Sequence, residues 1–358
     1  GGGRTDKREM LLALVAVSGE LQADMAVYAV ESEAYAAALI TRLKKEGLLA
    51  VRSREGAKGY VLRKKGKEFL MRCYPGSFDC LFHGAAETNH VKSEITRRLR
   101  LHRMSMAWAF GLRMGICIFP AEKPMFPPDL CGLERCVYYG ATEMKGGSDK
   151  VKGSRACGLM VCSGQPYVVY HTMDRRMKWA KKMERSMRQF AESLFWKQGQ
   201  FTMAEAVMIG NDMKMLREIL ESDGGPKGNL FQVDDIFEHW YYFSMQEEST
   251  LQLRLLTDRK VRKSFYHFLS QTLARRSEKE YAMEDGYDAQ GRPVYFCYEL
   301  ELCQLMRIKQ EAALGRKKGK VLCLDFQAEV LKEYFGEEVE ILAILSEKVR
   351  AYISGCPD

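Results

Sequence analysis

Apolar and polar positions along the first seventy residues follow a pattern that predicts three helices and then a hairpin. Apolar residues at helical spacing predict helices over 6–17, 23–30 and 32–46, and Ser32 stands where it can cap the third of them. Gly47 then ends that helix. The residues after it predict two short strands and a final helix, over 48–53, 60–63 and 65–72.

The middle of the chain mixes long helical stretches with strand-like runs. A long helix is expected over 89–114, with an apolar stripe toward a core and a basic outer face. The stripe includes Val91, Ile95, Leu99 and Met106, and the basic face carries Arg97, Arg98, Arg100 and Arg103. Strand-like runs follow, of which the last two read as a hairpin, over 137–141, 156–162 and 167–171. A second long helix is expected over 173–196.

In the last third of the chain, strand-like and helical stretches alternate. Strands are expected over 239–243, 294–298, 321–326 and 339–345, and helices over 260–274, 301–314 and 327–335. This alternation is typical of an α/β arrangement. We therefore expect an α+β or α/β multidomain chain: 4–74, then 85–221 as a mixed sheet flanked by helices, then 227–358 as an acidic α/β domain or an extension of the middle one.

Hydropathy and cysteine usage narrow the setting. No apolar run reaches the ~18 residues that cross a bilayer, so we expect no membrane partner and a cytoplasmic protein. The eleven cysteines lie mostly in stretches that read as buried, such as Cys117, Cys157, Cys162 and Cys323, where free thiols behave as small apolar side chains. Their spacing does not match a structural zinc site.

Charge is distributed unevenly. Residues 1–199 hold 34 Lys and Arg against 20 Asp and Glu, whereas residues 200–358 hold 21 against 27. The basic part is where a polyanion would bind, unless it is only a solvated surface. The acidic part is expected to contact a protein partner or a second copy of the chain.

The order helix, helix, helix, hairpin, with Leu39, Leu43, Gly47 and Leu48 ahead of a basic hairpin, resembles the winged helix-turn-helix of bacterial DNA-binding proteins. The resemblance implies that the third helix enters the major groove of duplex DNA and that the hairpin touches the backbone or minor groove. The contacting residues would be Arg42, Lys44 and Lys45 on the helix and Arg52, Arg54 and Lys58 on the hairpin. The alternative is a winged helix that binds another protein through this charged face.

A second motif lies in the middle of the chain, where Pro128 and Asp129 precede the sequence Glu143, Met144, Lys145. If the strand over 137–141 continues, Glu143 and Lys145 lie on one face of it. Two carboxylates can hold Mg²⁺ or Mn²⁺, which activates a water molecule that a lysine positions or deprotonates.

This pattern resembles the PD-(D/E)XK nuclease motif. The resemblance implies Asp129 and Glu143 as metal ligands, Asp129, Glu143 and Lys145 as catalytic residues, and Glu94 as the leading-helix acid of some members. The chain has three acid-x-Lys triplets, about as many as its composition gives by chance. Two alternatives therefore stay open: a nuclease-like fold without activity, and a surface ion pair on an unrelated fold.

The expected helix over 173–196 is rich in cations and carries Trp179 and Phe190 on its apolar side. Four of its cations form a second expected DNA-binding surface: Lys178, Lys181, Lys182 and Arg185.

Over residues 6–220 the combination of these features is similar to replication-relaxation proteins of Gram-positive plasmids and integrative elements. We therefore expect a duplex DNA-binding protein of a mobile element or plasmid with a metal-dependent nuclease-like domain, acting in replication, relaxation or transfer. The alternative is a non-catalytic DNA-binding regulator or replication accessory factor whose C-terminal part makes protein contacts.

Overall fold

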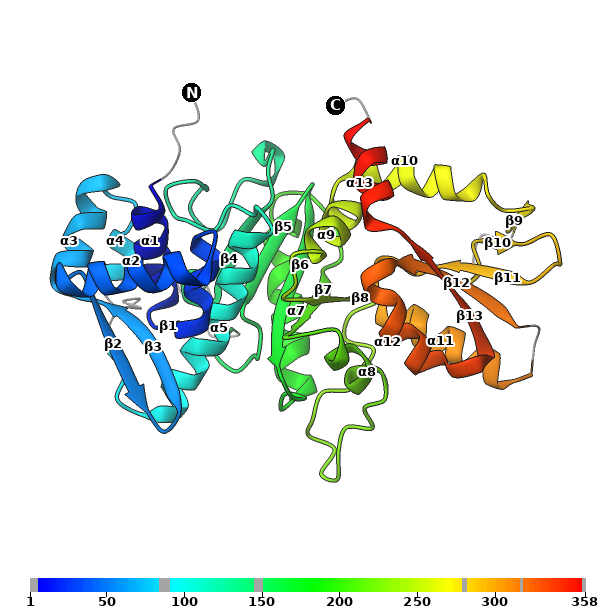
Figure 1. Cartoon of the computed structure of the whole chain (residues 1–358), viewed down its shortest axis with the longest axis horizontal. Coiled ribbons are helices and arrows are strands. Elements are labelled where there is room, and N and C mark those ends of the chain that lie inside the picture. Colours follow the sequence, from blue (N-terminus) through cyan, green and yellow to red (C-terminus); the bar gives the residue numbers. More distant parts are fainter. Residues whose placement is uncertain (1–5, 84–90, 145–150, 279–281, 316–317, 356–358) are drawn as a thin grey trace. The chain divides into compact units, whose positions relative to one another are not determined.

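The chain folds into two compact units (Figure 1). The computed structural model describes residues 6–83, 91–144, 151–278, 282–315 and 318–355. The first unit comprises Gly1–His171 and Lys182–Ala204, and the second comprises Thr172–Lys181 and Glu205–Asp358. The sequence predicts three domains, over 4–74, 85–221 and 227–358. Whether each of these ranges folds separately stays a prediction.

The first unit begins with the helices and the hairpin that the hydrophobic pattern predicts. Its elements are α1 (Lys7–Ser18), β1 (Leu21–Gln22), η1 (Ala23–Ala29), α2 (Glu33–Lys45), β2 (Leu49–Arg54), β3 (Ala57–Leu62), α3 (Lys64–Cys73) and α4 (Asp79–Phe82). The expected helices over 6–17 and 32–46 and the two strands are confirmed to within a few residues. The stretch 23–30 is instead a 3₁₀ helix, closed by a bond from Val30 N to Val27 O.

The strands of this segment form an antiparallel sheet in the order β1-β3-β2. The hairpin turns at Glu55 and Gly56, which both have positive φ angles, 51° and 80°. Such a two-residue turn matches the right-handed twist of the strands beside it. Glycine takes up this conformation without strain, which fixes the register of β2 on β3.

A long helix, α5 (Ile95–Arg113), packs against α1, η1, β1 and β3. It is shorter than the expected helix over 89–114. In its first turns, the side chains that face the core are not the ones that the sequence predicts. Leu99 is 45% exposed, while Arg98 is 1% exposed. The expectation that Leu99 faces the core and Arg98 the solvent is therefore wrong, because a buried carboxylate holds Arg98 inside.

The rest of the first unit is built on antiparallel strands. Its elements are η2 (Leu130–Gly132), β4 (Val137–Gly140), α6 (Ala141–Met144), β5 (Gly158–Cys162), β6 (Gln165–Met173) and α7 (Lys181–Trp196). The β5–β6 hairpin turns at Ser163 and Gly164, as the sequence predicts. Glu184 of α7 is fully buried and accepts hydrogen bonds from Ser154 Oγ and Tyr170 Oη at 2.6 and 2.9 Å. These bonds hold α7 on the strands.

The structure corrects the expected helix over 173–196. The helix α7 begins only at Lys181, and the residues before it form an extended segment that bridges to Leu230 through Lys178. Trp179 donates from Nε1 to Asp234 Oδ2 at 2.8 Å and packs edge-on against Phe231 and Trp240. Trp179 thus belongs to the core of the second unit and does not lie on the apolar side of α7.

Cys136 and Cys162 are joined as a disulfide with α-carbons 4.3 Å apart. The antiparallel register pairs Val137 with Val161, so the two cysteines meet across β4 and β5. The expectation that Cys162 is a free thiol is therefore wrong. Cys117, Cys157 and Cys323 are buried free thiols, as expected.

The second unit alternates strands and helices, as the sequence predicts. Its elements are β7 (Glu205–Gly210), α8 (Lys214–Leu220), β8 (Trp240–Ser244), α9 (Ser249–Thr257), α10 (Arg259–Ser270), β9 (Arg275–Arg276), β10 (Gly286–Tyr287), β11 (Pro293–Phe296), α11 (Leu302–Ala313), β12 (Gly319–Leu324), α12 (Asp325–Phe335), η4 (Gly336–Glu338), β13 (Val339–Ile344) and α13 (Ser346–Ser354). Strands β7 and β8 pair in parallel.

A mixed sheet with the order β13-β12-β11-β10-β9 forms the frame of this unit: β11 to β13 are parallel and β9 to β11 antiparallel. In Figure 1, α11 and α12 lie on one side of it and α10 and α13 on the other. Phe265, Leu324 and Val349 belong to one buried cluster that joins α10 and α13 to the strands. The expectation of mixed sheets flanked by helices is confirmed. No described helix is long and apolar enough to cross a membrane.

Candidate nucleic-acid interface

The helix α2 has one buried and one exposed face. Ser32 Oγ accepts a hydrogen bond from Tyr35 N, which caps the helix as predicted. The buried stripe consists of Ala36, Leu39, Ile40 and Leu43. The exposed face carries small side chains, those of Ala34, Ala37, Ala38 and Thr41, beside Tyr35, which is 47% exposed. The backbone of α2 can therefore approach a partner surface closely.

Three cations lie in the last turn of α2, and they differ in their surroundings. Arg42 Nε donates to Glu46 Oε1 at 2.9 Å, and Arg8 pairs with the other oxygen of that carboxylate at 2.6 Å. Lys44 and Lys45 are exposed and form no ion pair with any described residue. Both lysines are therefore available to an anionic partner.

The hairpin presents its own cations. Lys58 is exposed on β3. Arg54 pairs with Glu55 at 2.9 Å and donates to the backbone oxygen of Ser93 at 3.2 Å. An exposed ion pair of this kind contributes little to stability, about 0–1 kcal/mol, so Arg54 can exchange it for another anion.

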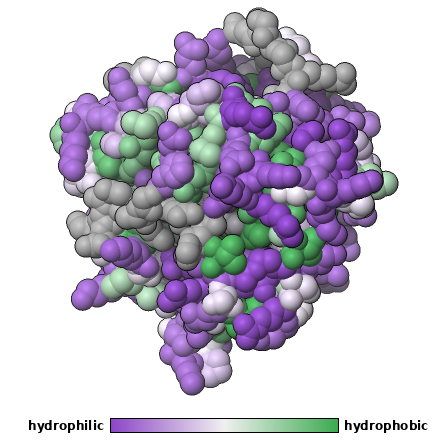
Figure 2. All heavy atoms as spheres, turned by 90° about the vertical axis from the view of Figure 1, so that its left-hand side faces the viewer, coloured by the Kyte–Doolittle hydropathy of each residue, from purple (hydrophilic) through white to green (hydrophobic). Residues whose placement is uncertain are grey.

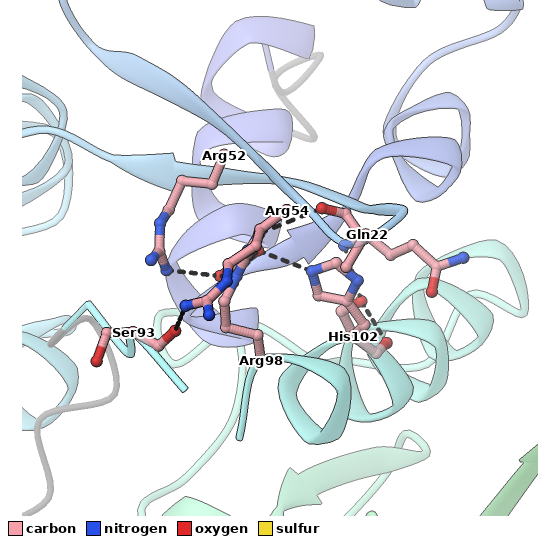
Figure 3. Close-up of polar contacts among 9 residues, drawn as sticks. Gln22, Arg52, Arg54, Ser93, Arg98 and His102 are labelled. Carbon is pink, nitrogen blue, oxygen red and sulfur yellow. Dashed lines mark hydrogen bonds and ion pairs between the residues drawn. The ribbon is translucent and has the colours of Figure 1, made fainter. Parts of the chain in front are cut away.

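Three basic side chains, those of Arg52, Arg98 and His102, which Figure 3 labels, converge on one buried carboxylate. Glu20 is 1% exposed and receives three basic side chains from two elements. Arg98 donates to Glu20 Oε1 from Nη2 at 2.7 Å, and His102 Nε2 lies 2.8 Å from the same oxygen. Arg52 donates to Oε2 at 3.0 Å. Because Arg52 comes from β2 and the other two from α5, the carboxylate fixes the hairpin on α5. We call these four residues the Glu20 cluster.

Neighbouring backbone completes the Glu20 cluster. A β-carbon on Gly59 would lie 2.6 Å from Glu20 Oε1 and 2.7 Å from His102 Nε2, so only glycine fits at this point of β3. Ser105 Oγ accepts a hydrogen bond from Gln22 N at 3.1 Å, which ties β1 to α5 as well. The cluster therefore occupies a space that the three strands and α5 enclose together.

Sequence reasoning missed Glu20 and His102 and placed Arg52 among the DNA contacts. The structure engages Arg52 with Glu20 and leaves its side chain only 22% exposed. A signal for the cluster does exist, because Arg98 and His102 stand four residues apart and continue the buried stripe of α5 through Met106.

The four cations of the second expected DNA-binding surface belong to two different units. Lys178 and Lys181 belong to the second unit, whereas Lys182 and Arg185 belong to the first. All four side chains are exposed. Lys178 precedes α7, so the four cations do not form one helical stripe.

The expected nuclease residues are not gathered by the described part of the chain. Asp129 is exposed, directly before η2, and Glu143 lies on the short helix α6 rather than on an extension of β4. Lys145 lies outside the described residues, so its place beside Glu143 stays a prediction. Among the described residues, no group of three or more His, Cys, Asp or Glu side chains is arranged to hold a metal ion.

Glu143 instead has a buried partner that the sequence did not reveal. Lys123 Nζ lies 2.9 Å from Glu143 Oε1 and over the rings of Trp108 and Tyr139, and Gly140 N donates to Oε2 at 2.8 Å. Burial lowers the pKa of Lys123 and raises that of Glu143, and the attraction between the two opposes both shifts. Both carboxylate oxygens are occupied, which does not fit a metal ligand.

The first prediction concerns the Glu20 cluster. Replacing Glu20 with Ala leaves the buried charge of Arg98 without a counter-charge, so the free energy of unfolding should fall by about 3–5 kcal/mol. Urea denaturation measures this decrease. The matched control is Glu94→Ala, which removes an exposed pair with Arg97 at 3.0 Å and should cost less than about 1 kcal/mol. Equal decreases in the two variants would show that the cluster is not a stabilising element.

The second prediction is a pH dependence. Burial alone would raise the pKa of Glu20, but hydrogen bonds from His102 and Arg98 lower it from 4.5 to about 2. The carboxylate therefore stabilises the fold fully above about pH 4.5 and loses this contribution as the pH falls toward 2. The stability difference between wild type and Glu20→Gln should narrow over that interval in urea titrations. A difference that stays constant from pH 7 to pH 2.5 would refute the assignment.

The third prediction separates an ion pair from a metal site. Glu143→Gln leaves the buried ammonium of Lys123 without a counter-charge and should lower the free energy of unfolding by about 3–5 kcal/mol. The double variant Lys123→Met with Glu143→Gln should be destabilised less than this single variant, because no buried charge remains. Thermal unfolding of the wild type with and without Mg²⁺ provides the control. A metal-dependent rise in the midpoint that Glu143→Gln abolishes would restore the metal-ligand interpretation.

Comparison with protein-family models, with curated proteins and with solved structures finds no match for this chain. Its function is therefore inferred from the geometry and charge of its own side chains.

Proposed function

We propose that residues 6–73 bind duplex DNA as a winged helix, with α2 in the major groove and the β2–β3 hairpin on the backbone beside it. The element order α1, β1, η1, α2, β2, β3, α3 and the sheet order β1-β3-β2 support this arrangement. The observation that carries the proposal is the outer face of α2, which combines small side chains with unpaired cations.

The small side chains suit a major groove. The major groove is wide enough to admit an α-helix, and a helix with small side chains on its outer face can approach the base edges closely. Ala34, Ala37 and Ala38 leave the first two turns of α2 narrow, and methyl groups such as theirs can contact the thymine methyl group. The small side chains therefore suit a binding partner with a groove that α2 can enter.

The free cations suit phosphate. Lys44 and Lys45 follow the small side chains along the exposed face of α2, and Lys58 lies on the hairpin. Phosphate contacts from such residues supply most of the affinity and position the protein on the duplex. We leave Arg52 out of the contact set because the Glu20 cluster engages it. Lys182 extends the proposal, as another exposed cation of the same unit.

The rival function is a winged helix that docks on another protein. Protein-docking faces commonly gather large apolar side chains into one patch. Figure 2 shows the side of the molecule that is on the left in Figure 1: it is mostly hydrophilic, and hydrophobic side chains appear in small groups. This surface favours a polyanion over an apolar protein face. Binding of duplex DNA is thus the function that the charge and shape of the first unit support best.

The fourth prediction tests the role of the two free lysines of α2. Replacing Lys44 and Lys45 with Ala should weaken duplex binding, because fewer phosphates are neutralised and fewer counterions are released. The slope of log affinity against log salt should fall by about one unit for each phosphate that is no longer neutralised. Fluorescence anisotropy on a labelled duplex between about 50 and 200 mM salt measures both quantities.

Its control is Lys332→Ala with Lys348→Ala, two exposed lysines of the second unit that give the same net charge. This control should keep the wild-type salt slope. Identical curves for both double variants would remove α2 from the interface and leave general electrostatic attraction as the explanation.

A further inference from the structure

The second unit contains a cleft of about 790 Å³ at the carboxyl end of β11. Phe296 and Tyr298 line the cleft, together with residues of α10 and α11. The volume is that of a small-molecule site. Its lining also includes Glu205 at the start of β7 and His239 just before β8.

Three cations line the cleft without a counter-charge. Arg259 and Lys263 stand one turn apart on α10, and Arg307 comes from α11. All three are exposed and none forms an ion pair within the part of the chain that the structure describes. Arg262, between them, is instead held by Glu299 in a two-bond pair at 2.7 and 2.9 Å. The three cations are therefore available to an anionic group, such as phosphate, that enters the cleft.

Glu205, the first residue of β7, is an acceptor that lines the cleft. Glu205 is half-buried and has no hydrogen bond or ion pair with any described residue, and burial raises the pKa of its carboxyl. The other interior acids are occupied: Asp285 accepts from Phe296 N at 2.7 Å, and Glu301 accepts from Trp240 N at 3.1 Å and from Gln304 N. An N–H donor of a ligand can therefore pair with Glu205.

Aromatic rings border the same space. Tyr266 is 44% exposed, and its ring meets Phe296 edge to face at 5.5 Å. The ring of Tyr241 lies beside His239, with centroids 6.2 Å apart. Tyr241 is buried, at 3% exposed, whereas the exposed face of Tyr266 can stack on a planar base.

We propose that this cleft binds a purine nucleotide, with its phosphate at Arg259, Lys263 and Arg307 and its base on Tyr266, donating to Glu205. Guanine presents two adjacent N–H donors to a single carboxylate. We therefore expect guanine nucleotides to bind more tightly than adenine nucleotides. This ligand site is independent of DNA binding by the first unit, so either proposal can fail alone.

Isothermal titration of the full chain with GMP, AMP, CMP, guanosine and inorganic phosphate tests the proposal. GMP should bind, while guanosine and phosphate, which each supply half of the contacts, should bind at least about tenfold more weakly. Arg259→Ala with Lys263→Ala should weaken GMP at least about tenfold and leave guanosine unchanged. Glu205→Gln should remove the preference for GMP over AMP.

The matched control is Lys260→Ala. Lys260 is an exposed cation of α10 that does not line the cleft, so this variant should bind GMP as the wild type does. Circular dichroism melting shows that each variant is folded. The proposal is overturned if no nucleotide binds at millimolar concentration, if phosphate alone binds as tightly as GMP, or if the Arg259 and Lys263 variant keeps wild-type affinity. Equal binding of CMP and GMP would overturn the assignment of a purine.

Discussion

The buried carboxylate of Glu20 is the interaction on which the N-terminal segment depends. Glu20 lies between α1 and β1, and its side chain receives Arg52 from β2 and Arg98 and His102 from α5. A carboxylate with several charge-assisted hydrogen bonds fixes the directions of all its partners, whereas apolar packing alone allows small shifts. The hairpin and α5 are therefore held in one arrangement, and the outer face of α2 is presented on a stable base.

Other buried charged side chains of the first unit also fix neighbouring elements to one another. Lys123 and Glu143 pair within an aromatic surround, and Glu184 receives hydrogen bonds from Ser154, Arg155 and Tyr170. Each case costs desolvation that only complete partnering offsets. Removing one partner of a buried pair should therefore lower the free energy of unfolding strongly, whereas the exposed ion pairs of the same unit contribute little to it. This difference also separates the cations into those that build the fold and those that remain free for a polyanion.

The sequence predicted the elements well where one local signal decided them. Ser32 and Gly47 mark the ends of α2, the turn residues Ser163 and Gly164 mark a hairpin, and apolar periodicity marked most helices and strands of both units. It failed where a distant partner decided the outcome. Arg98 is buried because it pairs with Glu20, and Glu143 pairs with Lys123. The four-residue spacing of Arg98, His102 and Met106 places Arg98 on the buried face of α5 but does not identify its partner, and the pairing of Glu143 with Lys123 has no local signal. The free lysines of α2 could be foreseen, whereas the engagement of Arg52 could not.

The central claim is that α2 and the hairpin contact duplex DNA. Hydrogen exchange of the full chain, with and without a random-sequence duplex at low salt, tests it most directly because it reports each segment separately. We expect added protection in 33–45 and 49–62 that disappears at high salt, and no change at Lys123 and Glu143. Protection confined to other segments, or none at concentrations where the duplex is bound, would contradict the account.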